Sequence, residues 1–142
     1  MIGTGGYLLD TNVISETRKS RADVGVIAFL SGADSAGLYL SVLTLGELRK
    51  GVAAKRRTDI VAGDQLGVWV DGIEANFADR LLSIDAQTAR LWGELSARRS
   101  LPVVDALIAA TAVNHSLTLV TRNIRDIEST GVRLIDPWSA RS

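Results

Sequence analysis

The sequence predicts an α/β protein with a central, mostly parallel sheet of about five strands and helices on both faces. Two observations support this fold class. Short apolar runs typical of strands alternate with longer stretches of helical periodicity. The 142 residues suit one compact domain. We find no internal repeat and no linker, so residues 1–142 are interpreted as a single domain.

The predicted strands are short apolar runs bounded by turn residues or by polar residues. They cover residues 7–9, 38–41, 80–84, 118–120 and 132–135. Pro137 ends the last of them, because proline cannot donate to a sheet ladder.

The predicted helices follow these strands. They cover residues 11–18, 23–30, 43–56, 62–77, 85–98 and 102–113. Asp23 and Asp85 are predicted N-caps, since aspartate accepts hydrogen bonds from the first free N–H groups of a helix. Pro102 opens the last of these helices, which is almost entirely small and apolar.

Composition excludes several classes of protein. The absence of cysteine rules out disulfides, thiolate zinc sites and a cysteine nucleophile. The 16 basic and 16 acidic residues balance, so only local patches of charge could bind nucleic acid. No signal peptide and no apolar run long enough to span a membrane is visible. We therefore expect a cytoplasmic protein that does not enter membranes.

Polar residues lie at the carboxyl ends of three of the predicted strands: Asp10, Ser41 and Thr121. Ligands of parallel sheets collect outside the carboxyl ends of the strands, so these side chains mark a candidate site. For Asp10, simple helix capping is an equally good explanation. Ser41, and Thr44 after it, fit either a supporting role in the site or ordinary strand-end and capping positions.

Two further acids lie within apolar helical segments. Glu47 shares a helical face with Leu43, and Asp105 precedes Ile108 and Ala109 on a face expected to meet the core. A buried carboxylate needs a partner or a metal ion. The alternatives are an ion pair of Glu47 with Lys50, and a capping role for Asp105 at the start of its helix.

The segment after the fourth predicted strand adds Asn123 and, three residues later, Asp126. Asn123 is also typical of an Asx turn. Oxygen ligands that converge at strand ends suit Mg²⁺ or Mn²⁺, which can lower the pKa of a bound water. His115 is best explained as a residue at a helix C-terminus, where the dipole favours it.

Basic residues border these acids. Arg49 and Lys50 lie within a turn of Glu47, while Arg122 and Arg125 flank Asn123. Such cations could hold a phosphate backbone, although each is also typical of a solvated face. Three tryptophans could stack on bases. Two of them, Trp69 and Trp92, fall on apolar helical stripes, so we expect these in the core or at a dimer interface.

Four segments taken in order resemble the PIN-domain family, in particular the VapC and FitB-like toxins. They are LLDTNVISE (8–16), LSVLTLGELRKGV (40–52), VVDALIAATAVNHSLTLVTRNIRDIE (103–128) and VRLIDPW (132–138). Each segment alone is moderately specific, and the ordered set spans nearly the whole chain.

The resemblance implies a PIN-like α/β/α sandwich and Mg²⁺- or Mn²⁺-dependent endonucleolytic cleavage of RNA. It implies an acidic core of Asp10, Glu47 and Asp105, with Asp10 and Asp105 as direct metal ligands. It also implies a homodimer and a cognate antitoxin that fills the active-site groove and carries out most DNA binding. The fourth site of the family is often aspartate.

Here Asn123 stands at that fourth place, so either Asn123 or Asp126 completes the site. We take Thr121 and Thr11 as further secondary candidates. Asn123 keeps a second hypothesis open, a PIN-like RNA- or protein-binding scaffold with weak or no catalysis. A metal-dependent phosphatase or receiver-like protein ranks last, because residues 10–12 lack the second aspartate of an Asp-x-Asp start.

Overall fold

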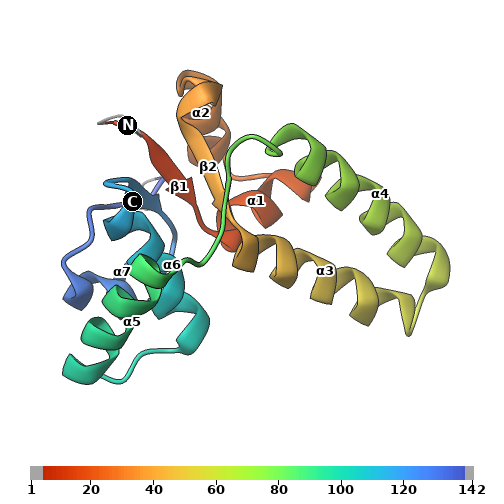
Figure 1. The fold of residues 1–142 in the computed structure, drawn as a ribbon. Coiled ribbons are helices and arrows are strands. Elements are labelled where there is room, and N and C mark those ends of the chain that lie inside the picture. The colour runs from red at the N-terminus through yellow and green to blue at the C-terminus, as the bar shows by residue number, and fades with distance from the viewer. Residues whose placement is uncertain (1–4, 140–142) are drawn as a thin grey trace.

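One parallel sheet of five strands organises the chain, in the order β3-β2-β1-β4-β5. The computed structural model describes residues 5–139 (Figure 1). Its strands are β1 (Tyr7–Leu9), β2 (Leu38–Ser41), β3 (Leu81–Leu82), β4 (Thr118–Val120) and β5 (Leu134–Ile135). The predicted parallel sheet is confirmed.

The two edge strands, β3 and β5, are shorter than the predicted runs 80–84 and 132–135. The sequence pattern does not detect this, because Ile84 and Val132 are apolar and continue the alternation beyond the paired residues. A short edge strand exposes few unpaired backbone groups, which limits pairing with other chains.

Seven α-helices and two 3₁₀ turns are formed within residues 5–139. The helices are α1 (Thr11–Arg18), α2 (Val24–Gly32), α3 (Val42–Arg56), α4 (Ile60–Asn76), α5 (Ala86–Arg98), α6 (Val103–Asn114) and α7 (Ile124–Ile127). The 3₁₀ turns are η1 (Ser35–Gly37) and η2 (Glu128–Thr130).

Local capping chemistry explains where several helices begin. Asp23 accepts from the backbone N–H groups of Gly25 and Val26, and Asp85 from that of Thr88 at 2.8 Å, so both predicted caps are confirmed. Helix α4 begins earlier than predicted, because Asp59 accepts from the N–H of Ala62.

Two cores flank the sheet, because successive strand residues point to opposite faces. Leu9 belongs to the core that includes buried residues of α1–α4, whereas Leu8 belongs to the core shared with α6. Six residues of α6 are buried, most of them alanines, which lets this helix pack closely. Helices α3 and α4 pack side by side and project away from the sheet as one arm (Figure 1).

None of the helices in the described part of the chain is both long and apolar enough to cross a membrane.

Candidate metal centre at the carboxyl edge of the sheet

Asp10 lies where β1 ends and α1 begins. It is 5% exposed, and its Oδ1 accepts a 2.8 Å hydrogen bond from the N–H of Thr11. Asp10 is therefore the N-cap of α1, as the capping alternative states. This role engages one carboxylate oxygen and leaves Oδ2 for another partner, so capping does not exclude a functional role.

That partner is Thr121, which follows β4 and is fully buried. Its hydroxyl donates to Asp10 Oδ2 at 2.8 Å. The hydroxyl oxygen of Thr121 also accepts from the N–H of Asn123 at 3.0 Å and from Asn12 Nδ2 at 3.3 Å. The strands β1 and β4 are neighbours in the sheet, so their carboxyl ends bring these residues together.

Asp105 reaches the same place from the other side of the sheet. Helix α6 begins at Val103 with Pro102 at its N-cap, so Asp105 lies in the first turn and the capping alternative is wrong. Asn123 Nδ2 donates to Asp105 Oδ2 at 3.2 Å, and the Asn123 side chain makes no capping bond to α7. A continuous hydrogen-bonded chain thus links Asp10, Thr121, Asn123 and Asp105.

Glu47 joins the site from α3 but is exposed, so the expectation of a carboxylate inside a buried stripe is wrong. The Thr11 hydroxyl donates to Glu47 Oε1 and lies 3.1 Å from the hydroxyl of Thr44. No ion pair involving Glu47, with Lys50 or any other cation, is formed within residues 5–139. Ser41 caps α3 by accepting from the N–H of Leu43.

The pKa values of Asp10 and Asp105 are raised by burial and by neighbouring negative charge. Burial raises the pKa of Asp10; the hydrogen bonds from Thr121 and Thr11 oppose this, and the charge of Glu47 adds to it. Burial also raises the pKa of Asp105, and the charges of Asp10, Glu47 and Asp126 raise it further. Asp105 therefore lies within electrostatic reach of three other carboxylates, and like charges of this kind disfavour ionisation.

A hard divalent cation fits this donor set, because it would neutralise the repulsion with oxygen ligands. Within residues 5–139, no three carboxylate or imidazole side chains converge tightly enough to form a ready-made cage. Mg²⁺ does not require one, since it usually binds through one or two carboxylates and keeps several waters. Asp10 and Asp105, joined through Thr121 and Asn123, provide such a pair.

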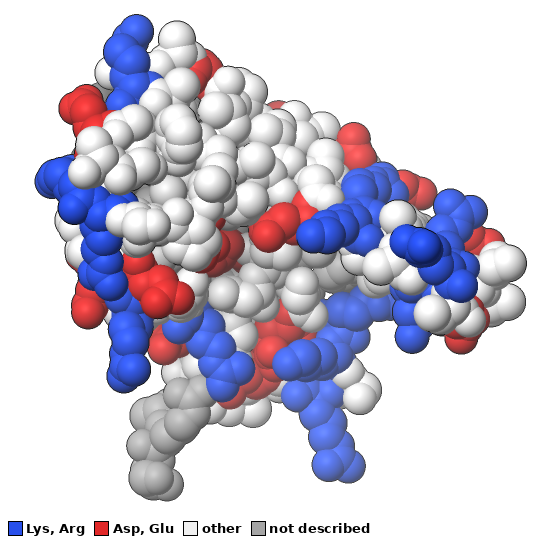
Figure 2. Space-filling model, turned by 90° about the horizontal axis from the view of Figure 1, so that it is seen from below, with Lys and Arg blue, Asp and Glu red and all other residues white. Residues whose placement is uncertain are grey.

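The basic residues proposed to hold a phosphate backbone lie in different environments. The Arg49 guanidinium pairs with Asp71 at 2.6 Å and Glu74 at 3.1 Å, so it joins α3 to α4. Arg122 lies over the ring of Trp138, 5.0 Å from its centroid. Lys50 and Arg125 are exposed. Figure 2 shows carboxylates with basic side chains around them, and basic side chains along the projecting α3–α4 arm.

Asn12 is a site residue that the sequence interpretation missed. Its side chain donates to Thr121 and accepts from the N–H of Arg122 at 3.4 Å, so it fixes the turn after β4 against α1. The sequence feature that could have indicated this role is the position of Asn12, two residues after Asp10 and close to the carboxyl end of β1. Trp69 packs against the first core as expected, and Trp92 is half-buried. His115 is the C-cap of α6, as expected.

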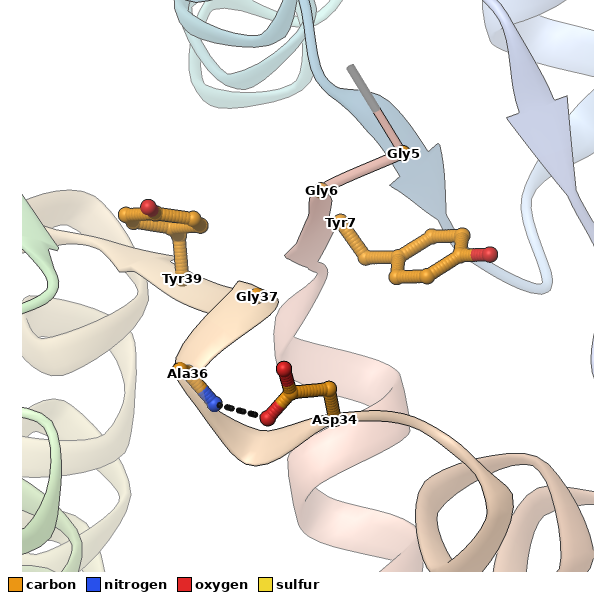
Figure 3. Close-up of a pocket in the computed structure, with 7 residues that line it drawn as sticks. All are labelled: Gly5, Gly6, Tyr7, Asp34, Ala36, Gly37 and Tyr39. Atoms are coloured by element: carbon orange, nitrogen blue, oxygen red, sulfur yellow. Dashed lines mark hydrogen bonds between the residues drawn. The ribbon is translucent and has the colours of Figure 1, made fainter. Parts of the chain in front are cut away.

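A hollow also lies at the opposite end of the strands, where β1 and β2 begin. It has a volume of about 270 Å³ and is lined by Tyr7, Tyr39, Asp34 and small residues. Figure 3 shows Gly6 and Gly37 between the two tyrosine rings, which point apart, and Asp34 accepting a hydrogen bond from the N–H of Ala36. Its single carboxylate caps a 3₁₀ turn, so this hollow lacks the acid cluster found at the carboxyl edge.

The sequence of this chain matches a known protein family. The sequence model of the PIN domain matches residues 7–131. The chain belongs to the PIN domain family. Among PIN-domain relatives, VapC ribonuclease Y4jK of Sinorhizobium fredii is 34% identical over 140 residues, which cover 92% of this chain and 96% of the relative. Toxin FitB of Neisseria gonorrhoeae is 33% identical, covering 92% of this chain and 97% of FitB.

Solved structures of PIN-domain toxins agree with this assignment. FitAcB from Neisseria gonorrhoeae superposes with a TM-score of 0.86 at 32% identity, covering 94% of this chain and 99% of that one. A structure of FitAB bound to a DNA fragment superposes with a TM-score of 0.80 at 30% identity, covering 96% and 98%. The expected PIN-like sandwich is thus confirmed.

Proposed function

We propose that this protein is a metal-dependent endoribonuclease and the toxin of a type II toxin–antitoxin pair, hydrolysing RNA phosphodiester bonds with a metal-activated water. The observation that carries the proposal is the hydrogen-bonded chain from Asp10 through Thr121 and Asn123 to Asp105. It holds two carboxylates of raised pKa at the ligand-binding edge of the sheet. Carboxylates with perturbed pKa values gathered at one place are typical of functional sites.

Asp10 and Asp105 are the proposed ligands of Mg²⁺ or Mn²⁺, with Asn123 or Asp126 completing the site. The ion, when bound, would activate a water and stabilise charge on the phosphodiester. Glu47, oriented by the Thr11 hydroxyl, would accept a hydrogen bond from the attacking water and orient it. Protein nucleophiles are not needed, which agrees with a chain that has no cysteine and a single histidine.

The remaining roles concern the substrate backbone. Lys50 and Arg125 are exposed beside the acids, so they are free to approach phosphates. Arg122 could act in the same way only by leaving the ring of Trp138, and Arg49 only by leaving Asp71 and Glu74. We therefore expect Lys50 and Arg125 to contribute more to RNA binding than the two residues already engaged.

The relatives suggest the partners. FitB is named a toxin, and the FitAB structure contains DNA. For this chain we propose a cognate antitoxin that covers the acidic site, contact with DNA only through that antitoxin, a homodimer, and RNA as substrate. A cytoplasmic location follows from a substrate and a partner of this kind.

Cleavage of RNA by the purified, antitoxin-free protein tests the proposal. We expect fragments of a cellular RNA mixture to appear with Mg²⁺ or Mn²⁺ and to disappear in excess EDTA. Asp105→Asn should abolish cleavage while the fold is retained. Asp34→Asn, the same change at the opposite edge of the sheet, is the matched control and should cleave normally. Full activity of Asp105→Asn, or full activity in EDTA, would contradict the proposal.

A PIN-like RNA- or protein-binding scaffold with weak or no catalysis is the second candidate. Asn123 favours it, because an amide replaces the carboxylate often found at this place and lowers the negative charge available to a cation. A scaffold predicts that the antitoxin-free protein binds RNA or a protein but binds no Mn²⁺ and cleaves nothing.

A further inference from the structure

A small groove adjoins the carboxylates on the side of the α3–α4 arm. It has a volume of about 170 Å³ and is bounded by α1, α3 and α4. Its lining residues are Thr11, Ser15, Arg18, Glu47, Leu48, Gly51, Leu66 and Trp69. Two of these, Thr11 and Glu47, are the hydrogen-bonded pair of the candidate metal centre, so the groove and that centre are continuous.

One wall of this groove combines an aromatic ring with a cation. The Arg18 guanidinium lies 5.6 Å from the centroid of the Trp69 ring. Trp69 is half-buried beside Leu66, whereas Arg18 is exposed at the rim. The guanidinium lies over the ring, so it covers part of the aromatic face and presents its own exposed planar face to the groove. A base can stack on an arginine plane of this kind, and the charge remains available to a phosphate.

Gly51 lines the groove on the α3 side and has no side chain that could occupy it. A Cβ atom at this position would meet no atom within 4 Å, so packing does not require glycine here. Glycine inside a helix is unfavourable relative to alanine by about 1 kcal/mol, and Gly51 lies well within α3. A larger side chain at position 51 would extend into the space that the groove occupies.

We propose that this groove, called here the Trp69 groove, holds one nucleobase of the RNA, next to the phosphate cleaved at the carboxylates. The inference rests on the proposed nuclease function and deepens it. Sequence-specific RNA recognition usually splays single bases onto aromatic or arginine planes. The Trp69 groove would thereby set both the register of cleavage and a preference for the base at one position.

Size and charge favour a base over an apolar side chain of a partner protein. The volume lies well below the ~300–1,000 Å³ of pockets that enclose drug-sized ligands, so one ring system suits it. Arg18 at the rim matches the phosphate that every nucleotide carries. Because Thr11 and Glu47 line both the groove and the candidate metal centre, a base held here would leave the neighbouring phosphate beside the carboxylates.

The test uses an RNA oligonucleotide that contains a cleavage site mapped with the wild-type protein. A matched set replaces one base at a time by an abasic position on either side of that site. For the wild type we expect one abasic position to lower kcat/KM on the order of tenfold, the size of effect that loss of one stacked base produces.

Gly51→Leu should fill the Trp69 groove. We expect it to cleave the intact oligonucleotide about tenfold more slowly and to lose its sensitivity to that abasic position. Gly93→Leu is the control, because Gly93 lies within α5, is exposed, and also has no atom within 4 Å of a Cβ. It should match the wild type on every oligonucleotide.

Arg18→Gln is a second variant on an exposed side chain, which keeps the test valid if Gly51→Leu does not fold. It should reduce the abasic sensitivity. Wild-type kcat/KM and abasic sensitivity in both variants would overturn the inference, and this is the outcome that a groove for a partner protein's side chain predicts. A wild-type protein that cleaves no RNA with Mg²⁺ or Mn²⁺ would instead refute the nuclease function itself.

Discussion

The hydroxyl of Thr121 donates a 2.8 Å hydrogen bond to Asp10 Oδ2, although the two residues are 111 positions apart in the chain. The contact is buried and joins the carboxyl ends of the neighbouring strands β1 and β4. The Thr121 hydroxyl oxygen also accepts from the N–H of Asn123. Thr121 therefore connects Asp10 at the end of β1 with Asn123 in the turn after β4.

Replacing Thr121 tests this connection. Thr121→Val removes a donor and an acceptor from a fully buried position, so Asn12 Nδ2 and the N–H of Asn123 lose the oxygen to which they donate. We expect a loss of about 1–3 kcal/mol in the free energy of unfolding, measured in urea, and slower RNA cleavage. Thr121→Ser keeps the hydroxyl and should retain most of both. Equal behaviour of the two variants would argue against the role given to the hydroxyl.

Asn123→Asp should strengthen metal binding. It adds a carboxylate next to Asp105, and affinity for hard cations rises with the charge of the ligands. We expect the Kd for Mn²⁺ to fall on the order of tenfold in calorimetric titration, which corresponds to about 1.4 kcal/mol. An unchanged or weaker Kd would mean that position 123 does not face the ion.

Gly25→Ala should destabilise the fold without touching the metal centre. A Cβ at Gly25 would clash with the carbonyl oxygen of Pro137 and lie 2.6 Å from the nitrogen of Ser139, and backbone atoms cannot easily move away. We expect a loss of about 1–3 kcal/mol in the free energy of unfolding. Gly32→Ala, in the same helix with open space around it, should be neutral or slightly stabilising. Similar stability of both variants would show that the chain after β5 does not pack on α2.

Asp23 should contribute to the loss of stability in acid. Hydrogen bonds from Ser139, Val26 and Gly25 hold the pKa of Asp23 below its ordinary value of 3.8, against the effect of burial. A carboxyl whose pKa is lower in the folded state stabilises the fold above its unfolded pKa. This stabilisation is lost as the pH falls through the folded pKa.

Urea unfolding of the wild type and of Asp23→Asn between pH 7 and pH 2 measures this contribution. The variant should be less stable at neutral pH, and the difference between the two proteins should shrink towards the acid end. A difference that stays constant with pH would exclude Asp23 from the acid response.

Residues whose role depends on local chemistry were predictable from the sequence. Asp23 and Asp85 are caps because an aspartate before a helical stretch can accept from its first N–H groups. Asp10 was predicted at the site because a polar residue directly after a strand lies at the carboxyl edge. Its double role, as cap and as partner of Thr121, depends on a contact that no local pattern contains.

Features that depend on packing between distant segments were not predictable. Glu47 is exposed because the buried face of α3 runs through Thr44, Leu48 and Val52. Which face of α3 is buried depends on its packing against α4 and the sheet (Figure 1). Arg49 was expected beside the phosphates, but its guanidinium lies against Asp71 and Glu74 of α4. Asn12 gained its role only when the turn after β4 packed against α1.

The most direct test of the account is calorimetric titration of the antitoxin-free protein with Mn²⁺. We predict saturable binding to the wild type and to the control Asp34→Asn, and loss of binding in both Asp10→Asn and Asp105→Asn, with the circular dichroism of all four proteins unchanged. Undiminished binding in the two site variants, or no binding to the wild type, would contradict a divalent metal centre built on Asp10 and Asp105.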